Sequence, residues 1–122
     1  MDRFMVNIAT AELNRTKDFY VRLFGFQVEY DSDWFVHLES ADTQLELGII
    51  LENNEYVPDG VRGGHKGFYL TFVVSDLDQT QSVAVEQGYK IVEEPKDTAY
   101  GQRRMLLNDP NGVAVDVSSP VS

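Results

Sequence analysis

Two acidic residues interrupt otherwise aliphatic stretches of this 122-residue chain. Glu46 stands in a Leu-Glu-Leu run and Asp116 in a Val-Asp-Val run. Such alternation is typical of a strand, and it places each acid on the face opposite its aliphatic neighbours. A carboxylate there needs a partner, because a buried and unpaired charge is costly. The two acids therefore predict either a pair that binds a cation or moves a proton, or structural acids satisfied by Arg104, Tyr69, Asn7 or water.

Two histidines are further candidates for chemistry. His37 lies in the strand-like run Trp-Phe-Val-His-Leu-Glu, and His65 follows two glycines in a polar segment. Either imidazole could bind a metal or a ligand, but a half-exposed strand histidine and a surface loop histidine are the commoner outcomes. The sequence leaves both roles open. It has no cysteine, which excludes thiolate chemistry and disulfides.

Aromatic and basic residues complete the set of candidates. Tyr56 and Tyr100 stand in loop-like contexts, where they could stack on a flat ligand. Trp34 and Phe35 could stack in the same way, but they occupy strand positions, where aromatic residues more often belong to the core. Of the two consecutive arginines at 103–104, which alternate between faces of a strand, one is expected to pair with an acid and the other to be solvated.

These candidates are distributed over two similar halves of the chain. Strand-like segments at 4–10 and 68–76 are each followed by a helical pattern of about three turns. Both helical patterns end at a glycine, Gly25 or Gly88, which suits the left-handed residue that stops a helix. Three further strands are predicted after each helix, at 26–31, 34–40 and 43–51 in the first half and at 89–94, 102–108 and 113–118 in the second.

Bulk properties limit the classes of function. The net charge of −10 disfavours the phosphate backbone of nucleic acid and favours a cationic ligand, although acidity also serves solubility alone. No apolar run approaches the roughly 18 residues of a membrane span, and the first residues do not resemble a signal peptide. A single soluble, cytoplasmic domain without a membrane or nucleic-acid partner is therefore expected.

Several short motifs recur in a fixed order. The first half carries Phe-Tyr and Leu-Phe-Gly-Phe within 19–26; the second carries Val-Ser-Asp-Leu at 74–77, Tyr-Gly-Gln-Arg-Arg at 100–104 and Asp-Pro-Asn-Gly at 109–112. The ordered set resembles the vicinal oxygen chelate superfamily of glyoxalases, bleomycin resistance proteins and dioxygenases. This resemblance implies an α+β fold in which two βαβββ modules form a curved mixed sheet around a cavity, with the helices outside. It implies one domain over 1–122, with module one at 1–52, a linker loop at 53–67 and module two at 68–122.

Metal enzymes of that superfamily hold their ion with four ligands, two from each module. Carried over by position, these ligands fall on Met5, Glu46, Tyr69 and Asp116. Met5 and Tyr69 stand at the two positions where an imidazole would be expected. Methionine is a soft, weak ligand and tyrosine is neutral at pH 7, so both imidazole ligands are lost. Two carboxylates alone make a poor transition-metal site. We therefore expect no cofactor, and a divalent metal would depend on Glu46 and Asp116, with a displaced His37 as a further donor.

The residues and the resemblance together predict a metal-free protein that binds a small molecule, such as a cationic or aromatic compound, and sequesters it as a homodimer. A metal-dependent lyase, isomerase or dioxygenase using Glu46 and Asp116 is the alternative, and a catalytically silent interaction domain is a third. A swapped dimer and an internally closed monomer are both compatible with the sequence. The predicted ligand-binding residues are Met5, Asn7, Glu46, Gly48, Tyr69, Thr71, Tyr100, Arg104 and Asp116.

Overall fold

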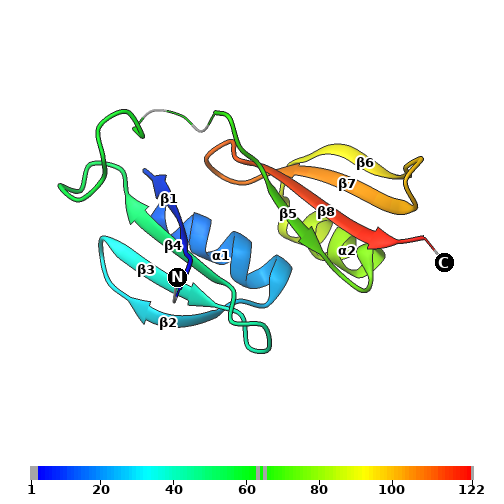
Figure 1. Ribbon diagram of the computed structural model, residues 1–122, viewed down its shortest axis with the longest axis horizontal. Coiled ribbons are helices and arrows are strands. Elements are labelled where there is room, and N and C mark those ends of the chain that lie inside the picture. The colour runs from blue at the N-terminus through cyan, green and yellow to red at the C-terminus, as the bar shows by residue number, and fades with distance from the viewer. Residues whose placement is uncertain (1–2, 63, 65, 122) are drawn as a thin grey trace. The chain divides into compact units, whose positions relative to one another are not determined.

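A computed structural model describes residues 3–62, 64 and 66–121 of the chain. In that part of the chain it contains eight strands and two helices, in two compact units that divide between residues 64 and 65. We call these units module one and module two. Each has the same order of elements, a strand, a helix and then three strands (Figure 1). The predicted α+β fold of two βαβββ modules is therefore confirmed.

Module one is a four-stranded mixed sheet with one helix. The sheet order is β1-β4-β3-β2, with β1 parallel to β4 and the other neighbours antiparallel. Because β4 lies between β1 and β3, side chains from all three strands meet on each face of the sheet. The elements are β1 (Val6–Thr10), α1 (Leu13–Phe24), β2 (Gln27–Asp31), β3 (Phe35–Glu39) and β4 (Glu46–Leu51).

Module two repeats this topology with the order β5-β8-β7-β6 and a parallel pair β5–β8. Its core includes Met105 and Leu107 from β7 and Val115 and Val117 from β8, all of them buried. These residues alternate along their strands, so the residues between them face the other side of the sheet. The elements are β5 (Leu70–Val73), α2 (Leu77–Gln87), β6 (Ile91–Asp97), β7 (Gln102–Asn108) and β8 (Ala114–Pro120).

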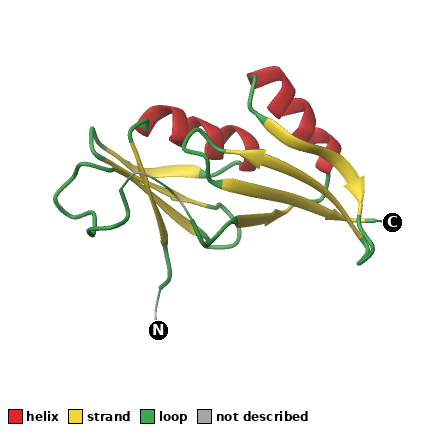
Figure 2. Ribbon diagram, turned by 90° about the horizontal axis from the view of Figure 1, so that it is seen from above, coloured by secondary structure: helices red, strands yellow, loops and turns green. Residues whose placement is uncertain are grey.

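The core of module one lies between its sheet and α1, and in each module the helix covers one face of its own sheet (Figure 2). Phe19 and Tyr20 of α1 are fully buried, with their ring centroids 4.9 Å apart in an edge-to-face arrangement. The sheet contributes Ile8, Leu38 and Ile49, which are also fully buried. Burying each such side chain stabilises the fold by about 1.5–3 kcal/mol. The helix thus fixes which face of the sheet remains for a site.

The two helices begin differently. Asp76 caps α2, because its Oδ1 accepts a hydrogen bond from the backbone N of Gln79 at 3.1 Å. Glu12 occupies the same place before α1 but makes no side-chain cap. Two hydroxyls replace that cap: Thr10 Oγ1 accepts from the backbone N of Glu12 at 2.7 Å, and Thr16 Oγ1 donates to its carbonyl at 2.8 Å. Neither helix in the described residues is long and apolar enough to cross a membrane.

The strand boundaries depart from the sequence prediction mainly at turns. The fourth strand was expected from residue 43, but β4 starts at Glu46. The preceding residues form a tight turn in which Ser40 Oγ accepts from the backbone N of Leu45 at 2.9 Å, and Gln44 adopts a positive φ of 58°. In module two, β6 runs on to Asp97 through Pro95, past the expected end at 94, with an irregular register between Glu93 and Lys96.

Candidate functional site

One face of the module one sheet, opposite α1, gathers most of the candidate residues of that module. The strand register pairs Glu39 with Glu46 and His37 with Gly48 between β3 and β4. It pairs Asn7 with Gly48 between β1 and β4. Because side chains alternate along a strand, the residues paired in this way lie on one face. We call this face the site face; it consists of Met5, Asn7, Ala9, Phe35, His37, Glu39, Glu46, Gly48 and Ile50.

An aromatic-lined pocket of about 540 Å³ occupies one end of the site face. The ring of Trp34 lies 5.8 Å from that of Phe35 and 6.0 Å from that of Tyr56, measured between centroids. Asn7 is the one amide of the lining, so the walls are almost entirely apolar. The lining residues are Met5, Asn7, Ala9, Phe35 and Ile50 from the sheet and its edge, and Trp34, Tyr56, Val57, Pro58 and Val61 from the loops.

Gly48 lies at the centre of the site face and leaves room for its neighbours. A Cβ atom at this position would lie 2.0 Å from Oδ1 of Asn7 and 3.1 Å from Cε1 of Phe35. The Asn7 side chain therefore lies directly over the backbone of β4, and the Phe35 ring approaches from the other side. Gly48 is therefore buried beneath these two side chains, between the apolar pocket and the polar residues further along β4.

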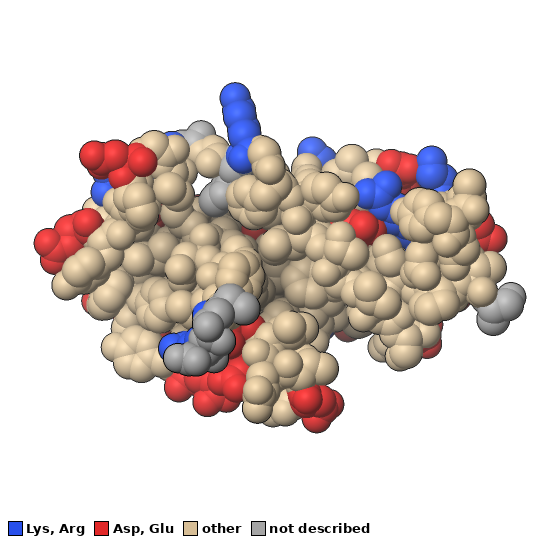
Figure 3. Space-filling model, viewed as in Figure 1, with Lys and Arg blue, Asp and Glu red and all other residues tan. Residues whose placement is uncertain are grey.

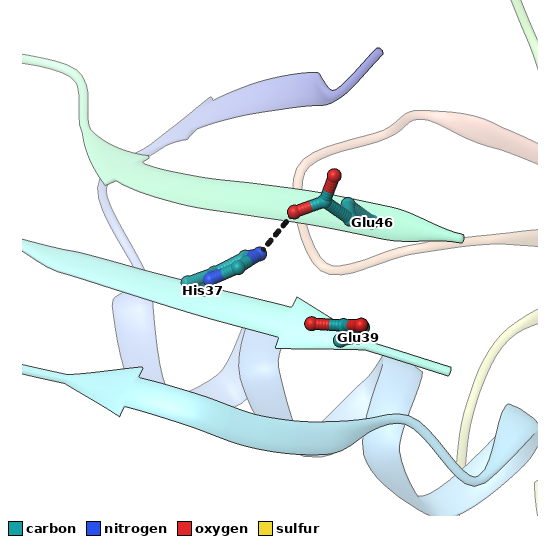
Figure 4. Close-up of side chains that lie close together, drawn as sticks. All are labelled: His37, Glu39 and Glu46. Carbon is teal, nitrogen blue, oxygen red and sulfur yellow. Dashed lines mark hydrogen bonds and ion pairs between the residues drawn. The ribbon is translucent and has the colours of Figure 1, made fainter. Parts of the chain in front are cut away.

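A charged cluster occupies the other end of the site face. The Glu46 side chain is only 9% exposed, and its Oε1 lies 2.7 Å from Nε2 of His37. Arg3 donates from Nε to Oε2 at 2.7 Å and from its terminal nitrogen Nη2 to Oε1. His37 and Glu46 point toward one another, and Glu39 projects beside them (Figure 4). This carboxylate is thus paired with both a guanidinium and an imidazole.

The cluster has a defined proton arrangement. The hydrogen bonds from Arg3 lower the pKa of Glu46 to about 2; burial opposes this shift and the hydrogen bond with His37 reinforces it. The carboxylate is therefore ionised at neutral pH and accepts only. Nε2 of His37 accordingly carries the proton and donates to Glu46, so its 3.3 Å approach to Arg3 brings two donors together and is not a hydrogen bond.

The same residues could also hold a metal ion. Among the described residues, His37, Glu39 and Glu46 each offer one ligand atom, and the three atoms lie within 4.8 Å of one another (Figure 4). One imidazole and two carboxylates suit a borderline divalent ion such as zinc. Arg3 already compensates the charge of Glu46, however, and a metal ion bound through Nε2 of His37 would have to displace the proton on that nitrogen.

Module two carries a second partnered acid. Asp116 is buried in β8, and its Oδ1 accepts from Nε of Arg104 and from Oγ of Ser118, both at 3.0 Å. Its Oδ2 accepts from Oγ1 of Thr71 at 3.1 Å. Hydrogen bonding to Asp116 raises the pKa of Arg104. A cavity of about 620 Å³ beside this network is lined by Gly67, Phe68, Tyr69, Arg104, Leu106 and Ala114.

The four positions that the resemblance assigned to metal ligands do not fit a metal centre. In each module the carboxylate, Glu46 or Asp116, is already paired with an arginine at hydrogen-bonding distance. The other two positions hold the thioether of Met5 and the phenol of Tyr69, which are weak donors for such ions.

The structure groups the other predicted residues by module. Met5, Asn7 and Gly48 lie on the site face of module one, while Tyr69 and Thr71 belong to the cavity and hydrogen-bond network of module two. Tyr100 lies exposed in the turn between β6 and β7. His65 lies outside the described residues. Whether any of these residues binds a ligand stays a prediction.

Sequence reasoning missed Arg3 as a contributor to the site and favoured the core over the pocket for Trp34. Arg3 was not considered, although it stands two residues before Met5 and four before Asn7, the spacing that puts residues on one face of an extended segment. Trp34 was expected in the core but lines the pocket. Figure 3 shows acidic side chains along the edge of the left-hand part of the view, where Figure 1 places module one, with largely uncharged surface between them.

The fold and the site together define the class of protein. The chain has two α+β modules, a pocket on one sheet and an acid paired with an arginine in each module. The chain belongs to the Glyoxalase/Bleomycin resistance protein/Dioxygenase superfamily, whose model matches residues 2–117. No curated protein matches the chain.

Solved structures share the fold at low sequence identity. One is TioX from Micromonospora sp. ML1, with a TM-score of 0.77 and 21% identity over 99% of this chain and 100% of the other. Another is a glyoxalase/bleomycin resistance protein/dioxygenase family enzyme from Burkholderia phytofirmans PsJN, with a TM-score of 0.77 and 21% identity over 96% and 97%. Lactoylglutathione lyase from Agrobacterium tumefaciens gives a TM-score of 0.71 and 16% identity over 96% and 92%.

Proposed function

We propose that the chain binds and sequesters a small molecule with a flat, apolar body, and that it does so without a metal. The observation that carries this proposal is the pocket on the site face, with about 540 Å³ of space between Trp34, Phe35 and Tyr56. Small-molecule sites are commonly about 300–1,000 Å³ and combine apolar walls with a few polar groups. Asn7 is such a polar group, and it can fix the orientation of a bound compound.

The chemistry of the acids also supports binding rather than metal catalysis. Glu46 and Asp116 are held by Arg3 and Arg104 in hydrogen-bonded ion pairs, so the negative charge of each acid is already compensated by an arginine. Glu46 is ionised and accepts hydrogen bonds from both Arg3 and His37, so it is a weak base at neutral pH. The site face therefore offers recognition groups more readily than proton-transfer groups.

Equilibrium dialysis tests this proposal directly. Chelator-treated protein would be dialysed against bleomycin and against proflavine, a flat tricyclic cation. We expect saturable uptake of one molecule per chain by at least one compound, with the compound recovered chemically unchanged. Substituting Trp34→Ala should weaken uptake, since it removes the largest aromatic wall of the pocket. Uptake of neither compound, or equal uptake by the variant, would contradict the proposal.

A metal-dependent reaction, as a lyase, isomerase or dioxygenase, is the second candidate, and the cluster of His37, Glu39 and Glu46 favours it. A divalent ion held by these three donors would polarise an oxygen of a bound compound. Elemental analysis after incubation with zinc, nickel or manganese tests it. One ion per chain that is lost in His37→Ala but kept in His65→Ala would support this candidate. No stoichiometric metal under any loading condition would remove it.

A further inference from the structure

We propose that the ligand of the module one pocket carries a positively charged group, and that this group replaces the guanidinium of Arg3 against Glu46. The inference rests on the proposed binding function and specifies its ligand as an aromatic amine, amidine or guanidine. In the free protein, the guanidinium of Arg3 occupies the place that the cationic group of the ligand would take.

The pocket and the charged cluster lie at opposite ends of the same site face. Met5 lines the pocket, and it immediately precedes Val6, the partner of Leu47 across β1 and β4. The two strands are parallel, so the residues that precede this pair, Met5 and Glu46, also lie beside one another. From Ile50 in the pocket to Glu46 is four residues of strand, a span of about 13 Å at ~3.3 Å per residue. One ligand can therefore reach both ends.

The carboxylate of Glu46 favours a cation at this place. Its side chain is only 9% exposed while it is paired with Arg3, and both of its oxygens accept hydrogen bonds from that guanidinium. A neutral compound that displaced Arg3 and covered Glu46 would leave this charge without a cation and with little water, which is unfavourable. A cationic group would restore the ion pair. The chain's own guanidinium shows that a planar cation fits, since both carboxylate oxygens accept from it.

Arg3 is placed so that it can leave at low cost. It lies before the start of β1 at Val6, and its side chain is 59% exposed while it is paired. A released guanidinium would return to water, where it is well solvated. His37 and Glu39 would remain beside the ligand's cation, and Glu39 adds a further negative charge near that position. The net charge of −10 favours the approach of cations over anions.

Three compounds with one aromatic body test the inference by isothermal titration calorimetry: 2-(2-naphthyl)ethylamine, 2-(2-naphthyl)ethanol and 3-(2-naphthyl)propanoate. We expect the amine to bind roughly tenfold more tightly than the alcohol, and the carboxylate to bind most weakly. Arg3→Ala should tighten the amine by roughly tenfold more and leave the alcohol unchanged, since no guanidinium competes. Glu46→Gln should abolish the preference for the amine.

Two matched variants control for net charge. Arg22→Ala removes a helical arginine paired with Asp18, and Glu93→Gln removes an acid paired with Lys96 in module two. Both should leave the ratio of amine to alcohol affinity unchanged. If Glu46→Gln does not fold, Arg3→Ala alone decides, because Arg3 is largely exposed.

The outcomes separate this inference from the proposed function. Equal binding of amine and alcohol in both the natural chain and Arg3→Ala would overturn the cation subsite and leave the aromatic pocket standing. A gain in amine affinity that Arg22→Ala reproduces would also overturn it. Failure of all three compounds to bind, together with failure of proflavine and bleomycin, would remove the binding function itself.

Discussion

Substituting Gly48→Ala tests the geometry at the centre of the site face. The new methyl would lie 2.0 Å from Oδ1 of Asn7 and 3.1 Å from Cε1 of Phe35. Contacts of this kind are optimal near 3.5 Å. The Asn7 amide must therefore move by ~1.5 Å, and the Phe35 ring by a few tenths of an ångström. Overpacking costs about 1–3 kcal/mol, and the low end applies because the Asn7 amide is the end of a flexible, exposed side chain.

A second effect partly offsets this cost. Alanine in a strand is about 0.5–1 kcal/mol better than glycine, because less backbone entropy is lost on folding. The free energy of unfolding should therefore fall by no more than about 1 kcal/mol. Ligand affinity should suffer more, because both displaced side chains line the pocket and are pushed into its space. We expect a loss of roughly tenfold or more, equivalent to about 1.4 kcal/mol.

Urea unfolding followed by circular dichroism would measure stability, and calorimetry with 2-(2-naphthyl)ethylamine would measure affinity. The double variant Asn7→Ala/Gly48→Ala removes the principal clash, so it should recover most of the stability lost, a coupling of about 1 kcal/mol. Gly64→Ala is the matched control, since a Cβ there meets nothing within 4 Å. A loss above ~3 kcal/mol that the double variant does not recover, or unchanged affinity in Gly48→Ala, would refute the reasoning.

Three further predictions concern the acids and the helix starts. Because the folded pKa of Glu46 is lowered to about 2 from 4.5, its stabilising effect is present above pH 4.5 and lost as the pH falls toward 2, so Glu46→Gln should flatten acid unfolding curves over that interval. Arg104→Ala leaves the buried Asp116 without its cation, and urea unfolding should show a loss of about 2 kcal/mol, less than for a fully buried pair because Arg104 is 31% exposed. Thr10→Val removes the hydroxyl that accepts from the start of α1 and should cost about 1 kcal/mol in the same assay, whereas an unchanged midpoint would show that this cap is not needed.

The fold could be predicted because its signals are local and occur twice. Strands such as β3 and β5 carry their own alternation, and Gly25 and Gly88 both adopt the left-handed conformation expected at a helix end. The start of α1 could not be predicted from a cap at Glu12, because the stabilising hydroxyls belong to Thr10, inside the preceding strand, and to Thr16. Such side-chain bonds leave no pattern in the hydrophobic periodicity.

The ion pair of module two could be predicted from the sequence, but the charged cluster of module one could not. One of Arg103 and Arg104 was expected to pair with an acid because the two alternate along a strand. The register places Arg104 opposite Ser118, two residues from Asp116. The pairing of His37 with Glu46 depends instead on the register of β3 against β4. The turn at 40–45 sets that register, and a shift of one residue would reverse every side chain of β4.

Arg3 was missed for a different reason. It lies outside any strand, and it reaches Glu46 across 43 positions of sequence through a long side chain. Neither propensity nor periodicity reports such a contact. Only a rule that every buried acid needs a partner identifies the need for a base, without naming which one.

The most direct test of a binding site on the module one sheet is to map the ligand contact by backbone amide chemical shifts. Titrating ¹⁵N-labelled protein with 2-(2-naphthyl)ethylamine should shift amides of β1, β3 and β4 and of residues 56–61, with Trp34 among the largest changes. Amides of β6 and α2 in module two should respond least. Shifts concentrated in module two, or spread evenly along the chain, would contradict a binding site on the module one sheet.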